Sequence, residues 1–216
     1  MIRQLEARRT TQERFNVEMP ENKLMWTLYA YYHDEVTRRG NEPTLNEEQK
    51  QCIREAAIWL ADPYGKPGLL LQGLYGNGKT TMMRAIVALI NDLYYSDLYE
   101  DRWNVKIVEA KDIALMGISK SDRQRDEFKK LCSEPLLAID DLGEEPAEIV
   151  SYGMIYTPVK DLLLERYKRQ AFTILTTNLV NTAEKQELSE HYGARVVDRF
   201  REMMKIIVFK NPSYRK

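Results

Sequence analysis

The chain has 216 residues, of which 44% are hydrophobic and 30% are charged, and this composition is typical of one folded domain of ordinary size. Its 32 Lys and Arg nearly balance its 33 Asp and Glu, so a globally basic coat for nucleic acid is excluded, although a local basic face is not. The 2 cysteines, far apart in sequence, and the 2 histidines argue against a disulfide framework or a Cys/His zinc module.

The cellular compartment follows from the same composition. The first residues are too polar for a signal peptide. No apolar run approaches the roughly 20 residues that a membrane-spanning helix needs. We therefore expect a cytoplasmic protein that does not contact membranes, and the few cysteines fit a reducing environment.

The beginning of the chain is predicted to be helical. Residues 1–19 are charged and weakly periodic, and we expect a frayed helix or a tail there. Between residues 21 and 39, apolar side chains recur every four positions, which predicts a helix that stops at the following glycine. A second helix is predicted after Pro43, where Thr44 and Glu47 have the spacing of a capping box.

Beyond the turn-forming residues 62–68 the pattern changes. Short apolar runs are separated by helical or loop segments, which is typical of strands buried on both faces of a parallel sheet. We therefore expect an α/β fold, with residues 1–44 as a short helical extension and residues 45–216 as the main domain. The expected strands are Gly68–Gly73, Val105–Ala110, Leu136–Ile139, Phe172–Thr176 and Ile206–Phe209, and a helix is expected from Lys79 to Tyr95.

The strongest motif lies between the first expected strand and the helix that follows it. Residues 73–80 read GLYGNGKT and match the phosphate-binding pattern G-x-x-x-x-G-K-[ST]. Its glycines allow a tight turn whose N–H groups face phosphate oxygens, and the helix adds its positive N-terminus. The alternative, a glycine turn with an exposed lysine, is disfavoured by this strand–loop–helix context. The predicted ATP-binding residues are Gly73, Gly76, Asn77, Gly78, Lys79, Thr80 and Thr81.

Two adjacent carboxylates end the third expected strand. Because like charges side by side repel, Asp140 and Asp141 indicate a site that uses them. We expect Asp140 to hold Mg²⁺ together with the Thr80 hydroxyl, and Asp141 to polarise the attacking water. Glu144 and Glu145 are nearby alternatives for the base.

Two further elements bear on catalysis. Asn178 follows the fourth expected strand, where it would position the attacking water beside a γ-phosphate. Arg195 and Arg199 are four residues apart on one helical face, and they are available to act on the nucleotide of a neighbouring subunit. The alternative for this arginine pair is a helix surface that carries ion pairs.

These elements, in this order, resemble an AAA+ ATPase of the DnaC/IstB family over residues 46–215. The resemblance implies a three-layer P-loop NTPase fold with a parallel five-stranded sheet of order 5-1-4-3-2, ATP and Mg²⁺ as cofactors, and Arg199 rather than Arg195 as the arginine finger. The chain stops soon after its fifth strand, so no C-terminal lid domain is expected, and Arg215 could serve only loosely as the second sensor arginine. The matching motifs are Gly73–Thr80, Ile139–Gly143, Thr176–Leu179 and Gly193–Phe200.

The same resemblance implies a function in DNA replication. We expect an ATPase that is weak alone and forms an ATP-dependent homo-oligomer, with a replicative helicase as its partner. A transposition helper of the IstB kind, whose partner is a transposase, shares every motif and stays open. A small-molecule P-loop kinase is less favoured because it has no use for Asn178 and Arg199, and a nucleotide-binding scaffold without hydrolysis is a further alternative.

Two basic segments are candidates for binding single-stranded or duplex DNA. Residues 195–216 hold 7 basic side chains against 2 acidic ones. Residues 120–130 hold 5 against 3, in a stretch where relatives contact single-stranded DNA. Either segment could neutralise phosphates, and either could equally be a solvated face.

Overall fold

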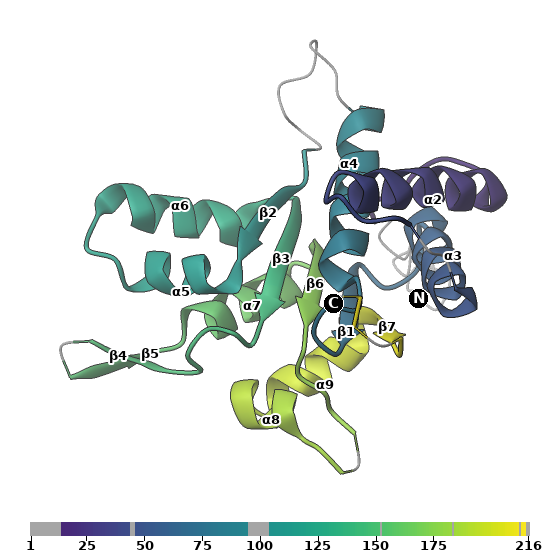
Figure 1. Cartoon of the computed structure of the whole chain (residues 1–216). Coiled ribbons are helices and arrows are strands. Elements are labelled where there is room, and N and C mark those ends of the chain that lie inside the picture. Colours follow the sequence, from purple (N-terminus) through teal and green to yellow (C-terminus); the bar gives the residue numbers. More distant parts are fainter. Residues whose placement is uncertain are drawn as a thin grey trace, which may run out of the picture.

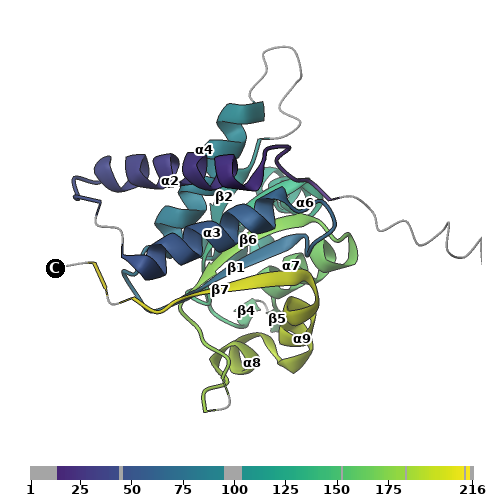
Figure 2. The same ribbon diagram turned by 90° about the vertical axis from the view of Figure 1, so that its right-hand side faces the viewer.

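The structure is a computed structural model that describes residues 14–43, 46–94, 104–151, 153–182, 184–211 and 213–214. Its centre is a parallel sheet of five strands, with helices on both faces (Figures 1 and 2). The expected α/β class with three layers is therefore confirmed. The strands of this sheet are β1 (Gly68–Gly73), β2 (Lys106–Glu109), β3 (Leu136–Leu142), β6 (Phe172–Thr177) and β7 (Met204–Phe209).

The sheet has the order β2-β3-β6-β1-β7. The labels β4 and β5 belong to a separate two-stranded hairpin. When only the strands of the parallel sheet are numbered along the chain, the order from β7 to β2 is 5-1-4-3-2, as the resemblance implied. In this order β1 lies between β6 and β7, so the loop after β1 opens between the ends of these two strands.

The side chains of each central strand alternate between two hydrophobic cores. On β1, Leu69 and Leu71 face one core, whereas Leu70 faces the other. The first core is covered by α2 (Glu21–Thr37), α3 (Glu47–Ala61) and α4 (Lys79–Tyr94). The second is covered by α5 (Ala110–Ile118), α6 (Asp122–Ser133), α7 (Pro158–Lys168), α8 (Glu187–Tyr192) and α9 (Ala194–Met203). None of the helices in the described part of the chain has the length and apolar character needed to cross a membrane.

Helix α2, the first helix in the described part of the chain, packs in the first core. Leu24, Leu28 and Tyr32 of α2 are fully buried there. The Tyr31 hydroxyl donates to Asp92 of α4 at 2.8 Å and ties the two helices together. The part of the chain expected as an extension therefore packs directly on the helix that follows the phosphate-binding motif.

Three local expectations need correction. The cap of α3 is Asn46, whose side chain accepts from the Gln49 N–H at 2.8 Å while Gln49 accepts from the Asn46 N–H at 3.1 Å. The expected capping pair of Thr44 and Glu47 is therefore wrong, because the helix begins at Glu47 and Asn46 occupies its N-cap position. Residues 14–19 form no helix, because Val17 is buried and its N–H bonds to a carbonyl of α3 instead. The first 13 residues lie outside the described part.

The third correction concerns the segment after β3. It contains a hairpin of β4 (Ile149–Ser151) and β5 (Met154–Tyr156), which extends away from the body of the molecule (Figure 1). Val150, Met154 and Ile155 are exposed on it. These strands have three residues each, too short for an alternating pattern to reveal.

A buried arginine joins α7 to β6 and to the end of α6. Arg166 is 1% exposed, and desolvation lowers its pKa from 12.5 to about 10. Its guanidinium donates to the Thr173 hydroxyl and to the carbonyls of Leu131, Glu134 and Phe172, at 2.6 to 3.1 Å. Because these acceptors are enclosed by protein, the arginine satisfies polar groups that water does not reach.

We expect Arg166→Ala to lower the free energy of unfolding by roughly 2–4 kcal/mol, because it leaves several buried acceptors without a donor. Arg169→Ala is the matched control: Arg169 is half exposed and pairs with Glu165 on the surface, so its loss should cost about 0.5 kcal/mol or less. Urea titration of both variants measures the difference. Equal losses would contradict the role assigned to Arg166.

Candidate nucleotide-binding site

The phosphate-binding motif forms a tight loop between β1 and α4. Gly78 has φ +97°, and a Cβ there would lie 2.8 Å from the Tyr32 hydroxyl. A Cβ on Gly73 would lie 2.5 Å from the Phe209 carbonyl oxygen of β7. Larger residues at either position would collide with α2 or β7, so the glycines allow both elements to close on the loop.

Two asparagines hold the same loop against the end of β7. The buried Asn77 amide donates to the Phe209 carbonyl at 3.0 Å. The Asn211 amide donates back to the Asn77 carbonyl at 3.0 Å. Gly76 accepts from the Tyr214 N–H at 2.9 Å. Asn77, expected as a nucleotide ligand, therefore has its amide nitrogen turned to the protein.

Lys79 lies at the centre of the site and is 5% exposed. Its ammonium group donates to the carbonyls of Gly73 at 2.9 Å and Leu74 at 2.7 Å. It also reaches the side-chain oxygens of Asn77 at 3.2 Å and Asn178 at 2.7 Å. The structure thus joins the expected motif lysine to the expected asparagine after β6.

The next side chain, Thr80, reaches the end of β3. Its hydroxyl donates to Asp140 at 3.0 Å, and the Thr176 hydroxyl of β6 donates to the same carboxylate oxygen at 2.5 Å. Asp140 is 4% exposed. A hydroxyl and a carboxylate are the hard oxygen ligands that Mg²⁺ prefers when it also binds phosphates, so these two residues fit the expected cation.

Asp141 is turned away from its neighbour by an irregularity in β3. The pairing of β3 with β6 shifts register between Ile139 and Leu142, and Asp141 has φ +53°. Its N–H donates to the Thr176 hydroxyl at 2.9 Å, while its side chain faces the cavity. Desolvation and the negative charges of Asp140 and Glu144 raise the pKa of Asp141 above its ordinary value.

The two glutamates that follow have different surroundings. Glu144 lines the cavity, where it accepts from the Tyr75 hydroxyl at 2.8 Å and from the Asn178 amide at 3.4 Å. Glu145 is 3% exposed and accepts from the Gly143 N–H at 2.9 Å and from the Tyr192 hydroxyl of α8. Of the two alternatives for the base, only Glu144 faces the cavity.

These residues border a cavity of about 960 Å³. One wall consists of the motif loop with Asp141, Glu144 and Asn178. A further part of the lining comes from the N-terminal segment, which carries no motif and was expected as a short helical extension. Their placement depends on how α2 packs against α4, which no local pattern encodes. These additional lining residues are Tyr32, Val36, Arg39, Gly40, Asn41, Glu42 and Pro43.

The two arginines of α9 lie elsewhere in the chain's own fold. Arg195 is exposed, and the Arg199 guanidinium lies 4.8 Å from the ring centre of Tyr167 on α7. Neither belongs to the described residues that line the cavity. Arg215, expected as a possible sensor, lies outside the described part.

The sequence matches no protein-family model and no curated protein. Solved structures do resemble the fold. The DnaC helicase loader has a TM-score of 0.58 and 21% identity, over 78% of this chain and 93% of that one. DnaI has a TM-score of 0.56 and 20% identity, over 91% of this chain and 94% of that one.

A third similar structure is AMPPCP-bound DnaA from Aquifex aeolicus, with a TM-score of 0.51 and 16% identity over 76% of this chain. The match covers 48% of the DnaA chain, about half its length. At these identities the likeness concerns the fold. The chain therefore shares the fold of these proteins, with the strand order that the resemblance implied.

We expect Asp141→Asn to keep ATP bound but to hydrolyse it at least about 100-fold more slowly, because a general base contributes roughly 10²–10⁴ in rate. Since a raised pKa protonates the carboxylate at higher pH, activity of the unmodified chain should fall on acidification earlier than for an ordinary aspartate. Glu144→Gln is the matched comparison. Full turnover by Asp141→Asn with loss in Glu144→Gln would move the role of base to Glu144.

Proposed function

We propose that this chain binds ATP with Mg²⁺ and hydrolyses it as a switch in DNA replication, where it acts as a helicase loader of the DnaC kind. The observation that carries the proposal is that the ends of β1, β3 and β6 meet at two consecutive residues of the motif, Lys79 and Thr80. Lys79 contacts Asn178, and Thr80 contacts Asp140. A parallel sheet brings these ends to one edge, which is where such folds bind nucleotides.

The side chains in this arrangement suit phosphoryl transfer, which depends mostly on positioning and on charge stabilisation. The neutral acceptors around Lys79 are weaker partners than phosphate oxygens, so the ammonium can transfer its donors to a triphosphate. Thr80 and Asp140 would hold Mg²⁺, which neutralises charge on the phosphates when bound. Asp141 would orient the attacking water, with Asn178 positioned between Lys79 and Glu144 to align it.

The role as a loader is supported by the similar structures, of which one is described as a helicase loader and another as a replication initiator bound to AMPPCP and single-stranded DNA. A transposition helper shares the same motifs. Capture of a hexameric replicative helicase by the tagged chain in the presence of ATP supports the loader. Capture of a transposase with no helicase would instead assign the chain to transposition.

The arginines of α9 are proposed to act between subunits. Because neither Arg195 nor Arg199 lines the cavity of its own chain, an arginine finger from this helix must serve the nucleotide of a neighbour. Arg199 is preferred, since it is the second arginine of the motif and Tyr167 holds its guanidinium by a cation–π contact. Hydrolysis would then depend on assembly into a homo-oligomer.

We expect Arg199→Ala to reduce assembly-stimulated hydrolysis at least about 10-fold while the affinity of the single chain for ATP stays unchanged. Supplying an arginine in trans is worth roughly 10³–10⁵ in related reactions. ATP hydrolysis measured across protein concentration, with and without single-stranded DNA, gives the readout. Arg201→Ala, exposed on the same helix, is the control. A loss in Arg195→Ala alone would make Arg195 the finger.

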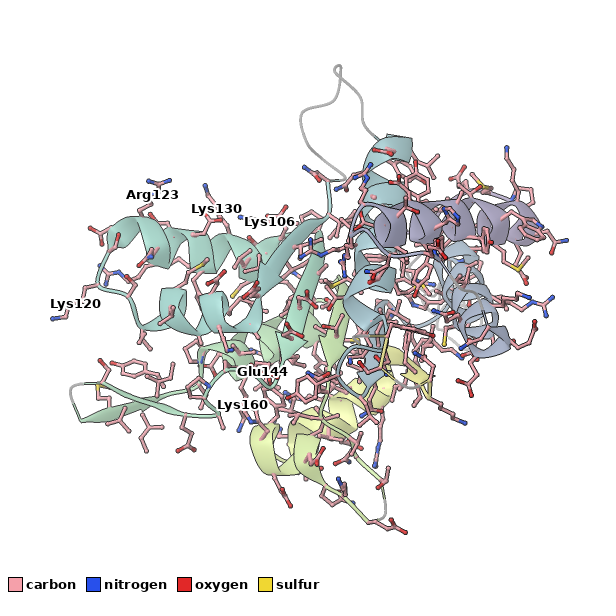
Figure 3. All side chains as sticks on the ribbon, viewed as in Figure 1. Lys106, Lys120, Arg123, Lys130, Glu144 and Lys160 are labelled. Carbon is pink, nitrogen blue, oxygen red and sulfur yellow. The ribbon has the colours of Figure 1, made fainter. Side chains whose placement is uncertain are left out.

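DNA binding is proposed for the outer face of α6. Ion pairs with neighbouring acids engage Lys106, Arg125 and Lys129. Arg123 and Lys130 project from α6 beside Lys106, on the side of the molecule away from Glu144 (Figure 3). These outward cations are suited to phosphates of a single strand, whose binding releases counterions.

We expect affinity for single-stranded DNA to fall with added salt, and the double substitution Arg123→Gln with Lys130→Gln to flatten the logarithmic slope by about 0.7 per lost phosphate contact. Lys168→Gln and Arg169→Gln, on the surface of α7, form the control. Fluorescence anisotropy at several salt concentrations gives the slopes. An unchanged slope in the α6 variant would contradict this face as the DNA contact.

A further inference from the structure

The turn that follows α2 brings a second cation to the lining of the cavity. Arg39 follows the end of α2, in a tight turn where its N–H bonds to the Val36 carbonyl at 3.2 Å. Its guanidinium donates to the Thr81 hydroxyl of α4 at 3.0 Å. Both Arg39 and Thr81 line the cavity. A charged group from the N-terminal segment thus contacts the first turn of the helix on which phosphates would rest.

The position along α4 indicates which phosphates Arg39 would meet. Lys79, Thr80 and Thr81 are consecutive, and successive residues of a helix point in different directions. Lys79 turns to Asn178 and Thr80 to Asp140, on the side where the terminal phosphate and the attacking water belong. Thr81 turns to Arg39 instead. With the terminal phosphate placed beside Asn178 and Asp140, the phosphates nearer the nucleoside would lie on the side of Arg39.

The Arg39 guanidinium also has further N–H donors that a stronger acceptor could use. It presents five N–H donors, of which one contacts the neutral Thr81 hydroxyl. Glu35 lies 4.0 Å away from its other amino nitrogen, at the outer limit of an ion pair. A phosphate accepts charge-assisted hydrogen bonds from arginine in a two-pronged geometry that neither a hydroxyl nor a distant carboxylate matches.

We propose that Arg39 binds the α- and β-phosphates of the nucleotide held by its own chain. This assignment rests on the proposed ATP-binding function. It gives the segment before the motif a part in recognition: Lys79 would hold the terminal phosphate, and Arg39 would hold the phosphates nearer the nucleoside.

The test is a titration of ATP, ADP and adenosine, each with Mg²⁺, into the full chain and into Arg39→Ala. We expect the affinities for ATP and ADP to fall by a similar factor, about 10- to 100-fold, since charge-assisted hydrogen bonds are lost. Adenosine binding should stay unchanged, and Arg39→Lys should recover part of the loss. Arg38→Ala is the matched control, because its side chain is exposed and pairs with Asp34 at 2.8 Å.

Affinities of Arg39→Ala within twofold of the unmodified chain would overturn the assignment. An equal loss for adenosine would also overturn it, because the substitution would then have changed the shape of the cavity rather than a phosphate contact. Hydrogen exchange gives a second readout. ADP should slow exchange over residues 34–43 in the unmodified chain but not in Arg39→Ala, and equal protection in both would contradict the contact.

Lys79→Ala separates this inference from the function on which it rests. If Lys79→Ala binds ATP as tightly as the unmodified chain, the proposed nucleotide site itself is wrong. If Lys79→Ala loses ATP while Arg39→Ala retains it, the site is supported and only the role of Arg39 is rejected.

Discussion

The site depends on one enclosed cation. Lys79 is 5% exposed, and its ammonium group contacts acceptors on the motif loop and on the segment after β6. A charge out of water must be hydrogen-bonded to be tolerated, so these contacts fix where the loop and Asn178 stand relative to each other. For the proposed phosphoryl transfer, the side chains already lie close together, and the Lys79 ammonium has to exchange its protein acceptors for phosphate oxygens.

The same constraint links the fold to the site. The loop can close around Lys79 because Gly73 leaves room for the Phe209 carbonyl of β7 and Gly78 leaves room for the Tyr32 hydroxyl of α2. Tyr32 is itself buried in the core that α2 shares with α3 and α4. Helix α2 thus lines the cavity as well as packing on the core, and the turn after it places Arg39 beside the first turn of α4.

Much of this arrangement could be predicted from local sequence. Short apolar runs predicted the strands of the parallel sheet, and the motif at residues 73–80 predicted the loop between β1 and α4. Long-range packing could not be predicted in this way. Glu145 looks like Glu144 in sequence, but the Tyr192 hydroxyl and the Gly143 N–H hold it away from the cavity. The residues from α2 that line the cavity carry no motif, because their part follows only from where the helix packs.

The most direct measurement is a crystal structure of the full chain grown with a non-hydrolysable ATP analogue and Mg²⁺. We expect a triphosphate bound by residues 73–80, with the ammonium of Lys79 donating to its oxygens and the metal beside Thr80 and Asp140. A nucleotide bound elsewhere, or a cavity that stays empty with Lys79 still bonded to Asn178, would contradict this expectation.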